Sequence, residues 1–359
     1  MEYVHGGDIY TYGDVLDYSS NINPFGAPRC AKEAARTAAE SIEHYPDNRC
    51  RELGGALSGY LGIDADRIAF GNGAADLIFG LAFAEKPSKA LLVAPSFAEY
   101  AQALEASDCN VVYHGLDRDK GFDLDEGYLD ALGEDIDMLF LCTPNNPTGR
   151  AMDKGLLERV MDRCGELGIR MVLDECFCDF LDDPEKQTMM EYVADGEHPQ
   201  LVVLRAFTKI YGMPGLRLGY MLSSDDDLME RMQRTRQPWS VSNVAQAAGI
   251  AALSAEDASQ SDDGLGWSER TRRYVSGERA WLEGKLDELG VEHLPSDANF
   301  ILLRSDADLF SGMLEHGILI RDCSNYIGLE TGYYRIAVKR REQDELLVDA
   351  ISQVLSSRR

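Results

Sequence analysis

The chain has 359 residues, of which 45% are hydrophobic, and its formal net charge is −27. This length accommodates one large domain and a smaller one, and the hydrophobic content is typical of a globular protein rather than a disordered one. The acidic charge argues against nucleic acids and anionic membranes as partners, because both are bound through basic surfaces.

The N-terminal sequence MEYVHGGD has neither the basic region nor the apolar region of a secretory signal. No apolar run reaches the roughly 18–20 residues that a membrane helix needs. The eight cysteines are scattered, and the spacing of Cys176 and Cys178 suits neither a zinc site nor a redox pair. We therefore expect a cytoplasmic protein with reduced thiols and no metal site.

The N-terminal segment, residues 1–30, is rich in Gly, Tyr, Asn and Pro and is expected to be irregular. A helix is expected over residues 29–43, and a proline at position 46 follows it. From about residue 50, seven short apolar runs predict strands: Ile68–Phe70, Ala90–Ala94, Val111–His114, Met138–Cys142, Arg170–Leu173, Leu201–Arg205 and Leu216–Leu222.

Most of these runs are separated by stretches with helical periodicity, namely Ala75–Ala84, Phe97–Glu105, Asp125–Leu132 and Lys154–Leu167. Strands that alternate with helices indicate a mostly parallel sheet with helices on both faces. Ligands of such sheets bind at the carboxyl ends of the strands, where this sequence places its Gly, Asn, Asp and Lys residues.

The C-terminal third has a different pattern. Residues 225–285 have helical periodicity, with an acidic loop at Glu256–Gly266, and further elements are expected at Asn299–Leu303, Tyr334–Val338 (strands) and Glu342–Leu355 (helix). This pattern predicts a small α+β domain that includes the N-terminal arm. We expect a division into residues 1–40 (arm, part of the small domain), 41–260 (large domain) and 261–359 (small domain).

The segment Leu201–Gly219 contains the most informative residue, Lys209. It follows a buried strand, where an ammonium group costs several kcal/mol unless it is paired or neutralised. A desolvated lysine of lowered pKa can form a Schiff base with an aldehyde cofactor. The neighbouring Thr208 and the later Arg217, which suits a phosphate, favour that role over a surface lysine at a strand end.

Other strand ends add to this pattern. Gly71-Asn72-Gly73 precedes a helix whose free N–H groups suit an anion, although most such triplets are only tight turns. Phe97 can lie over a planar cofactor, or belong to the core. The loop Thr143–Gly149 fixes the direction of one amide side chain. Asp174 ends a strand, and its buried carboxylate would need a cation such as a protonated pyridine nitrogen.

In this order, these motifs resemble the aspartate-aminotransferase superfamily of pyridoxal-phosphate enzymes, over nearly the whole chain. The resemblance implies an α/β fold of the pyridoxal-phosphate-dependent transferase type (fold type I). A large domain with a mostly parallel seven-stranded sheet would be joined by a small α+β domain. It also implies the cofactor pyridoxal 5'-phosphate and a homodimer with active sites at the interface.

The resemblance also implies a role for individual residues. Lys209 is similar to the Schiff-base lysine, Asp174 to the partner of the pyridine nitrogen, Asn146 to the donor to the ring hydroxyl and Phe97 to the stacking ring. Tyr45 would reach in from the other subunit. The cofactor phosphate would be bound by Gly73, Ala74, Ala75, Thr208 and Arg217.

Two branches of the superfamily are similar to this chain: the histidinol-phosphate aminotransferases and the L-threonine-O-3-phosphate decarboxylases of cobalamin biosynthesis. The chain resembles the decarboxylase branch more closely, on the stretches HGG, SSNINPFG, FAEY, LFLCTPNNPTG, RQPWSVSNVAQ and ILIRDCSNYIGLETGYYRIAV. Phe177 also fits that branch, since the aminotransferases usually carry a tyrosine there. Ala206 departs from both branches, which tend to place a hydroxyl residue at that position.

Both reactions use the same catalytic residues, so the residues that anchor the substrate decide between them. The anchors expected from the resemblance are Arg321 and Arg335, with His5, Asn21 and Asn146, although arginines often form only surface salt bridges. The expected reaction is decarboxylation of a phosphorylated amino acid, L-threonine O-3-phosphate, to (R)-1-amino-2-propanol O-2-phosphate. The alternatives are histidinol-phosphate transamination, decarboxylation of L-serine O-phosphate, and a non-enzymatic protein that binds pyridoxal phosphate.

Overall fold

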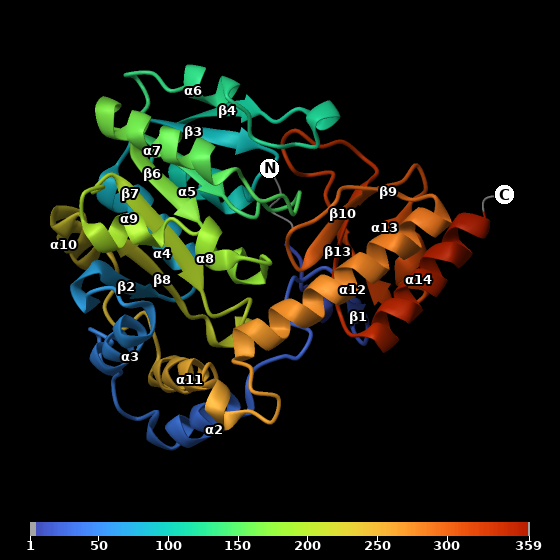
Figure 1. Ribbon diagram of the computed structural model, residues 1–359, viewed down its shortest axis with the longest axis horizontal. Coiled ribbons are helices and arrows are strands. Elements are labelled where there is room, and N and C mark those ends of the chain that lie inside the picture. The colour runs from blue at the N-terminus through green and yellow to red at the C-terminus, as the bar shows by residue number, and fades with distance from the viewer. Residues whose placement is uncertain (1–4, 358–359) are drawn as a thin grey trace.

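The computed structural model describes residues 5–357 and contains two main sheets of unequal size, each with its own helices (Figure 1). The larger sheet has the strand order β2-β8-β7-β6-β5-β3-β4. Its strands are β2 (Ile68–Gly71), β3 (Lys89–Ala94), β4 (Asn110–Gly115), β5 (Met138–Cys142), β6 (Arg170–Asp174), β7 (Leu201–Ala206) and β8 (Gly219–Ser223).

Strand β8 runs antiparallel to both of its neighbours, β2 and β7, and the remaining pairs are parallel. Every residue of β5, β7 and β8 is buried, which explains why their sequences are mainly apolar. The charged exception, Arg205, is paired with Glu175 and Asp179. The expected α/β fold with a mostly parallel seven-stranded sheet is therefore confirmed.

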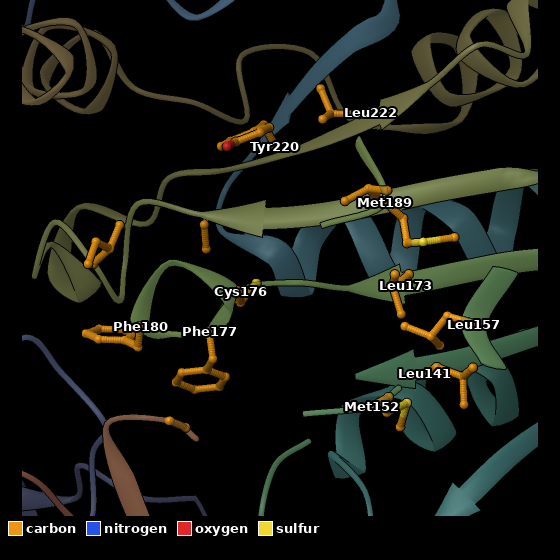
Figure 2. Close-up of a cluster of buried hydrophobic side chains, with 14 of the residues drawn as sticks. Leu141, Met152, Leu157, Leu173, Cys176, Phe177, Phe180, Met189, Tyr220 and Leu222 are labelled. Carbon is orange, nitrogen blue, oxygen red and sulfur yellow. The ribbon is translucent and has the colours of Figure 1, made fainter. Parts of the chain in front are cut away.

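Helices pack on both faces of this sheet and create two apolar layers. One layer includes Leu141 and Leu173 from the strands, with Leu157 from a covering helix (Figure 2). The other includes Phe140 and Tyr100. The helices of this half are α2 (Arg29–Ala38), α3 (Arg51–Leu61), α4 (Ala74–Glu85), α5 (Ala98–Ala106), α6 (Gly127–Asp130), α7 (Lys154–Leu167), α8 (Pro184–Gln187), α9 (Met190–Asp195), α10 (Asp226–Thr235) and α11 (Asn243–Ser254).

The smaller sheet is antiparallel, with the order β12-β13-β10-β9, and a separate two-stranded sheet pairs β1 with β11. The helices α12, α13 and α14 accompany these strands (Figure 1). The elements are α1 (Ile9–Tyr12), β1 (Leu16–Asp17), α12 (Trp267–Leu289), β9 (Glu292–His293), β10 (Phe300–Arg304), α13 (Leu309–Glu315), β11 (Ile318–Leu319), β12 (Arg321–Asp322), β13 (Tyr333–Ala337) and α14 (Arg341–Ser356).

The structure differs from the sequence-based expectations at several elements. The helix expected over residues 29–43 ends at Ala38, and the one expected at Asp125–Leu132 is a single turn, Gly127–Asp130.

The strand expected at Leu216–Leu222 begins only at Gly219, because Pro214 opens a 3-10 turn and Arg217 adopts a left-handed conformation with φ of 55°. Helix α3 was not predicted, because its Gly-Gly pair and scattered apolar residues weaken the periodic signal. The expected domain boundaries after residues 40 and 260 stay a prediction.

Among residues 5–357, no helix is both long enough and apolar enough to cross a membrane.

The N-terminal arm is attached to the last helix by a buried hydrogen bond. The Tyr18 hydroxyl donates to Asp344 Oδ1 over 2.8 Å, and both residues are fully buried. The backbone N–H of Ala337, in β13, donates to the carbonyl oxygen of Tyr18. Burial of Asp344 raises the pKa of its carboxyl group to about 7, and the hydrogen bond from Tyr18 acts in the opposite direction.

Tyr18→Phe removes this donor and leaves a buried carboxyl oxygen with one partner fewer. We expect the free energy of unfolding, measured by urea denaturation, to fall by about 1–3 kcal/mol. Tyr10→Phe is the control, since Tyr10 is 93% exposed, and should change it by no more than about 0.5 kcal/mol. Equal stability of the two variants would show that the Tyr18 hydrogen bond does not stabilise the arm.

Candidate active site

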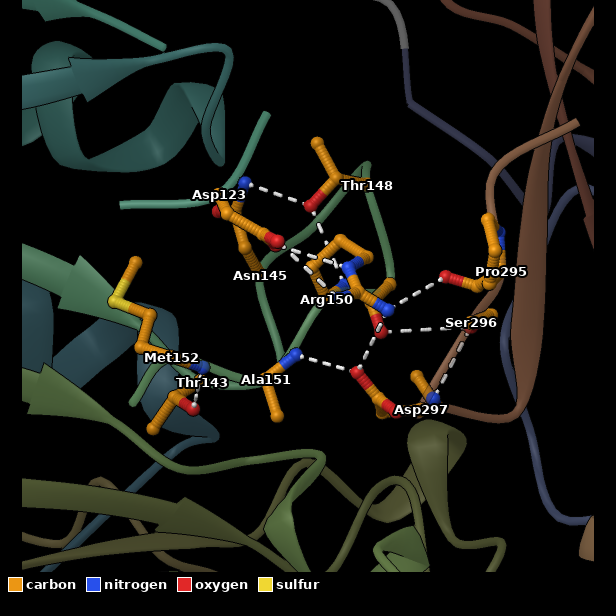
Figure 3. Close-up of polar contacts among 12 residues, drawn as sticks. Asp123, Thr143, Asn145, Thr148, Arg150, Ala151, Met152, Pro295, Ser296 and Asp297 are labelled. Atoms are coloured by element: carbon orange, nitrogen blue, oxygen red, sulfur yellow. Dashed lines mark hydrogen bonds and ion pairs between the residues drawn. The ribbon is translucent and has the colours of Figure 1, made fainter. Parts of the chain in front are cut away.

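The loop Thr143–Gly149, after β5, is fixed between the two sheets (Figure 3). Arg150 Nε donates to Asp123 over 2.9 Å, and Arg150 Nη1 donates to the carbonyl oxygen of Pro295 over 3.2 Å. A second connection joins the Ala151 N–H to Asp297 over 2.9 Å. These bonds hold the loop from both sides, so the direction of Asn146 within it is constrained.

Asn146 meets Arg335, which comes from β13 of the smaller sheet. Asn146 Oδ1 accepts a hydrogen bond from Arg335 Nη1, and Arg335 Nη2 donates to the Ser19 carbonyl oxygen over 2.8 Å. The guanidinium lies 5.4 Å from the ring centroid of Phe300. Arg335 is only 5% exposed, and within residues 5–357 no ion pair joins it to a carboxylate. Its charge is therefore buried against neutral groups.

Arg321 stands directly opposite Arg335 across the β12–β13 pair, and it is only 6% exposed. Arg321 Nη2 donates to Asn325 Oδ1 over 2.8 Å. Like charges that face one another across a sheet are destabilising, and the cost grows with burial. An anionic ligand would relieve this repulsion, so the pair indicates a binding site for an acidic molecule.

Lys209 lies just beyond β7, and its Nζ is 5.2 Å from the ring centroid of Phe177. Desolvation lowers the pKa of Lys209 to about 8, and the positive charges of Arg335 and Arg217 act in the same direction. A substantial fraction of the amine is therefore neutral near physiological pH. A neutral amine is the form that can attack an aldehyde carbon.

Asp174 ends β6 and is only 4% exposed. Its Oδ2 accepts from the Tyr100 hydroxyl over 2.7 Å, and its Oδ1 accepts from the Cys176 N–H over 2.9 Å. Burial and the adjacent carboxylate raise the pKa of Tyr100 well above its usual value, so Tyr100 keeps its proton and remains a donor. The remaining acceptor sites on Asp174 suit a cationic N–H.

Phe97 immediately precedes α5, three residues before Tyr100, and the two rings contact edge to face at 5.5 Å between centroids. It is partly buried. A partly buried ring at the sheet edge, fixed against a buried one, offers an apolar face to a planar ligand.

The N-terminus of α4 forms an anion cradle. No side chain caps it at Gly73, so the N–H groups of Ala74 and Ala75 at the start of the helix have no intrahelical partners. Arg217 lies against Gly73, where a Cβ atom would collide with the guanidinium. The nearby Thr208 is 6% exposed. The glycine thus allows the cation to approach the helix end, a combination that suits a phosphate.

Three further residues that the sequence predicts for the site, His5, Asn21 and Tyr45, have no described contact with Lys209 or Asp174. His5 Nδ1 lies 3.0 Å from Glu99 Oε1. Asn21 is 2% exposed, and its buried Oδ1 has no hydrogen-bond partner among the described residues. Tyr45 is 81% exposed, its ring lies 4.8 Å from that of Trp239, and no described contact joins it to the other candidate residues. The roles expected for these residues stay predictions.

Several residues of the site were missed at the sequence level. Tyr100 donates to Asp174, Glu99 pairs with His5, and Tyr326 Oη lies 3.5 Å from Arg335 Nη1. The available signal for Tyr100 was its position three residues after Phe97, in the first turn of the expected helix, which brings the two rings into contact. No local signal connects Glu99 with His5, which is 94 residues earlier in the sequence.

Taken together, the site has an amine of lowered pKa, a buried carboxylate with free acceptor capacity, an aromatic platform and a phosphate cradle. These match the aldehyde, pyridine nitrogen, ring and phosphate of pyridoxal 5'-phosphate. The donor set therefore fits that cofactor: Lys209, Asp174, Phe97, Asn146, Thr208 and Arg217, with the N-terminus of α4.

Residues 13–351 match the family model described as aminotransferase class I and II. The threonine-phosphate decarboxylase of Salmonella typhimurium is 40% identical, over 98% of this chain and 96% of that protein. A histidinol-phosphate aminotransferase of Methanothermobacter thermautotrophicus is 30% identical, over 95% and 89%. The structure of L-threonine-O-3-phosphate decarboxylase from Porphyromonas gingivalis superimposes with a TM-score of 0.80, at 28% identity, covering 95% of this chain and 100% of that one. The chain therefore belongs to the aminotransferase class I and II family.

Proposed function

We propose that this chain is a pyridoxal-phosphate-dependent carboxy-lyase that converts L-threonine O-3-phosphate to (R)-1-amino-2-propanol O-2-phosphate. The observation that carries the proposal is the pair of buried arginines that face each other across β12 and β13. This substrate bears a carboxylate and a phosphate on one small molecule, and both groups bind well to guanidinium. The similarity to threonine-phosphate decarboxylases supports the same reaction and a place in cobalamin biosynthesis.

When bound, pyridoxal 5'-phosphate withdraws electrons from the substrate bond that breaks at Cα. Asp174 would hold the proton on the pyridine nitrogen, and the hydroxyl of Tyr100 keeps the carboxylate in place. The Nζ of Lys209 would bind the cofactor aldehyde in the resting enzyme and later return a proton to Cα. Arg335 and Arg321 orient the substrate, and that orientation determines which bond breaks.

Transamination of histidinol phosphate is the alternative that the same cofactor residues allow, and a 30% identical relative carries that name. Histidinol phosphate has a phosphate but no carboxylate, so it would occupy only one of the two opposed guanidinium groups. L-Serine O-phosphate carries both groups and differs by one methyl. A non-enzymatic binding protein would have no use for a second buried arginine beside the cofactor residues.

We also propose a cytoplasmic homodimer in which Tyr45 contributes to the site of the partner. The support is the exposure of Tyr45 and of Trp239, which is 47% exposed. Large aromatic side chains exposed side by side are typical of protein interfaces.

The first prediction concerns the reaction itself. The purified enzyme with pyridoxal 5'-phosphate should release carbon dioxide from L-threonine O-3-phosphate without any keto acid, and more slowly from L-serine O-phosphate. Lys209→Ala should reduce turnover by at least about 100-fold, because proton transfer by a positioned base contributes about that much or more. Lys186→Ala, at an exposed pair with Asp183, is the control. Strict dependence on 2-oxoglutarate would identify an aminotransferase instead.

The second prediction tests the buried arginine. Arg335→Gln should raise the KM for L-threonine O-3-phosphate by about 10- to 100-fold, since hydrogen bonds to charged groups contribute about 1.5–3 kcal/mol. Arg335→Lys should recover only part of this loss, because lysine keeps the charge but not the planar fork. Arg234→Gln, at an exposed helix pair, serves as the control. An unchanged KM in Arg335→Gln would mean that Arg335 does not bind the substrate.

The third prediction follows from the lowered pKa of Lys209. Covalent incorporation of pyridoxal 5'-phosphate into the apoenzyme should accelerate as the pH rises, with a midpoint near pH 8, and level off at higher pH, where the amine is mostly neutral. Arg335→Gln should move this midpoint to higher pH, because it removes a cation that lowers the pKa. Absorbance of the protein-bound cofactor measures the rate. A wild-type midpoint near 10.5, the ordinary value, would contradict the desolvated lysine.

A further inference from the structure

Glu99 is a partly buried carboxylate that is not among the residues expected to hold the cofactor. It lies in the first turn of α5, two residues after Phe97, and its side chain is 14% exposed. Its Oε1 is 3.0 Å from Nδ1 of His5, whose side chain is 55% exposed. The pair thus connects the N-terminal arm to a helix of the larger sheet, at the edge of the candidate site.

The backbone next to His5 is fixed independently of Glu99. The Gly7 N–H donates to Ser19 Oγ over 2.7 Å, and Ser19 Oγ donates to Asp17 Oδ1 over 2.6 Å. A Cβ atom at Gly6 would collide with the Ser19 carbonyl oxygen, so the close approach requires glycine. The histidine backbone is therefore anchored beside Ser19, and the contact with Glu99 orients the imidazole ring.

The imidazole is surrounded by charges of both signs. His5 and Arg321 line a cavity of about 430 Å³ with Asp8 and Asp322, and Glu99 faces the ring from α5. The hydrogen bond to Glu99 raises the pKa of His5, whereas burial and Arg321 oppose the rise. Among these groups, Glu99 is the one in direct contact with the ring.

We propose that Glu99 is a positioning residue for the phosphate of the substrate: it holds His5 protonated and oriented, so that the imidazolium and Arg321 present two cations to one anion. This inference rests on the proposed function. Without Glu99, the nearby guanidinium would favour neutral imidazole, and the arm would offer a weaker partner to the phosphate.

The direction of the pH dependence follows from this arrangement. Below the pKa of His5 the imidazolium is present and the phosphate binds well, and as the pH rises through that pKa the cation is lost and KM rises. Glu99→Gln lowers the pKa of His5, so the rise of KM should shift to lower pH. The phosphate group itself titrates near pH 6, but it does so equally with both enzymes and cancels in their comparison.

The test measures kcat and KM of wild type and Glu99→Gln for L-threonine O-3-phosphate between about pH 6 and 9. Near neutral pH we expect KM to increase on the order of tenfold with kcat unchanged. KM for L-threonine, which lacks the phosphate, should not change. His5→Gln should have the same effect, and the double variant should be no worse than either single one. Glu105→Gln, an exposed position on the same helix, is the control.

Two direct readouts separate this inference from the proposed function. NMR titration of His5 in the holoenzyme should give a lower pKa in Glu99→Gln, and inorganic phosphate should bind more weakly to that variant. An unchanged His5 titration, or an unchanged KM profile in an active enzyme, would overturn the role of Glu99. If the wild type released no carbon dioxide while both readouts changed as expected, the proposed function would be wrong and the role of Glu99 in phosphate binding would stand.

Discussion

The buried guanidinium of Arg335 is the constraint on which the rest of the site depends. It is bonded to Ser19 in the arm and to Asn146 in the loop after β5, and it lies over Phe300 in the smaller sheet. These are neutral partners, and neutral acceptors offset only part of the cost of burying a cation. The guanidinium therefore connects three segments that are distant in the sequence. Its positive charge is only partly compensated, and an anionic ligand can neutralise it.

The candidate site is positively charged, whereas the chain as a whole carries a large negative charge. The formal net charge is −27, yet the positive charges of Arg217 and Arg335 both act on Lys209, and Arg321 stands opposite Arg335 across the smaller sheet. The site thus concentrates positive charge inside an acidic protein, which favours small anions while the outer surface repels polyanions. The carboxylate of Asp174, held by Tyr100 and the Cys176 N–H, offsets only part of this field: it raises the pKa of Lys209, but desolvation and the arginines leave that pKa lowered.

Site residues could be predicted from the sequence where they follow directly on a recognisable strand or helix pattern. Buried strands are mainly apolar runs, so the carboxyl ends of β6 and β7, and with them Asp174 and Lys209, could be located from the sequence. Helix α3 could not be predicted from the sequence, because it lacks clear periodicity. The late start of β8 could not be predicted either, because it depends on the left-handed conformation of Arg217. The contact of Glu99 with His5 depends on how the arm folds back, which no local pattern encodes.

The residues expected to hold the cofactor and those expected to bind the substrate come from different parts of the fold, which explains how one scaffold can support different reactions. Lys209 and Asp174 lie at the ends of β7 and β6, whose residues are buried except for Arg170, so the core would set the position of the cofactor. The arginines and His5 come from the smaller sheet and from the arm, whose polar contacts with the larger domain include those of Arg335 with Asn146 and of His5 with Glu99. Apolar packing, such as that of Phe300 on Phe177, also joins the two parts. Substrate choice can therefore change through those contacts while the cofactor residues stay in place. If the proposed function holds, the arm, although far from Lys209 in sequence, takes part in selecting the bond that breaks.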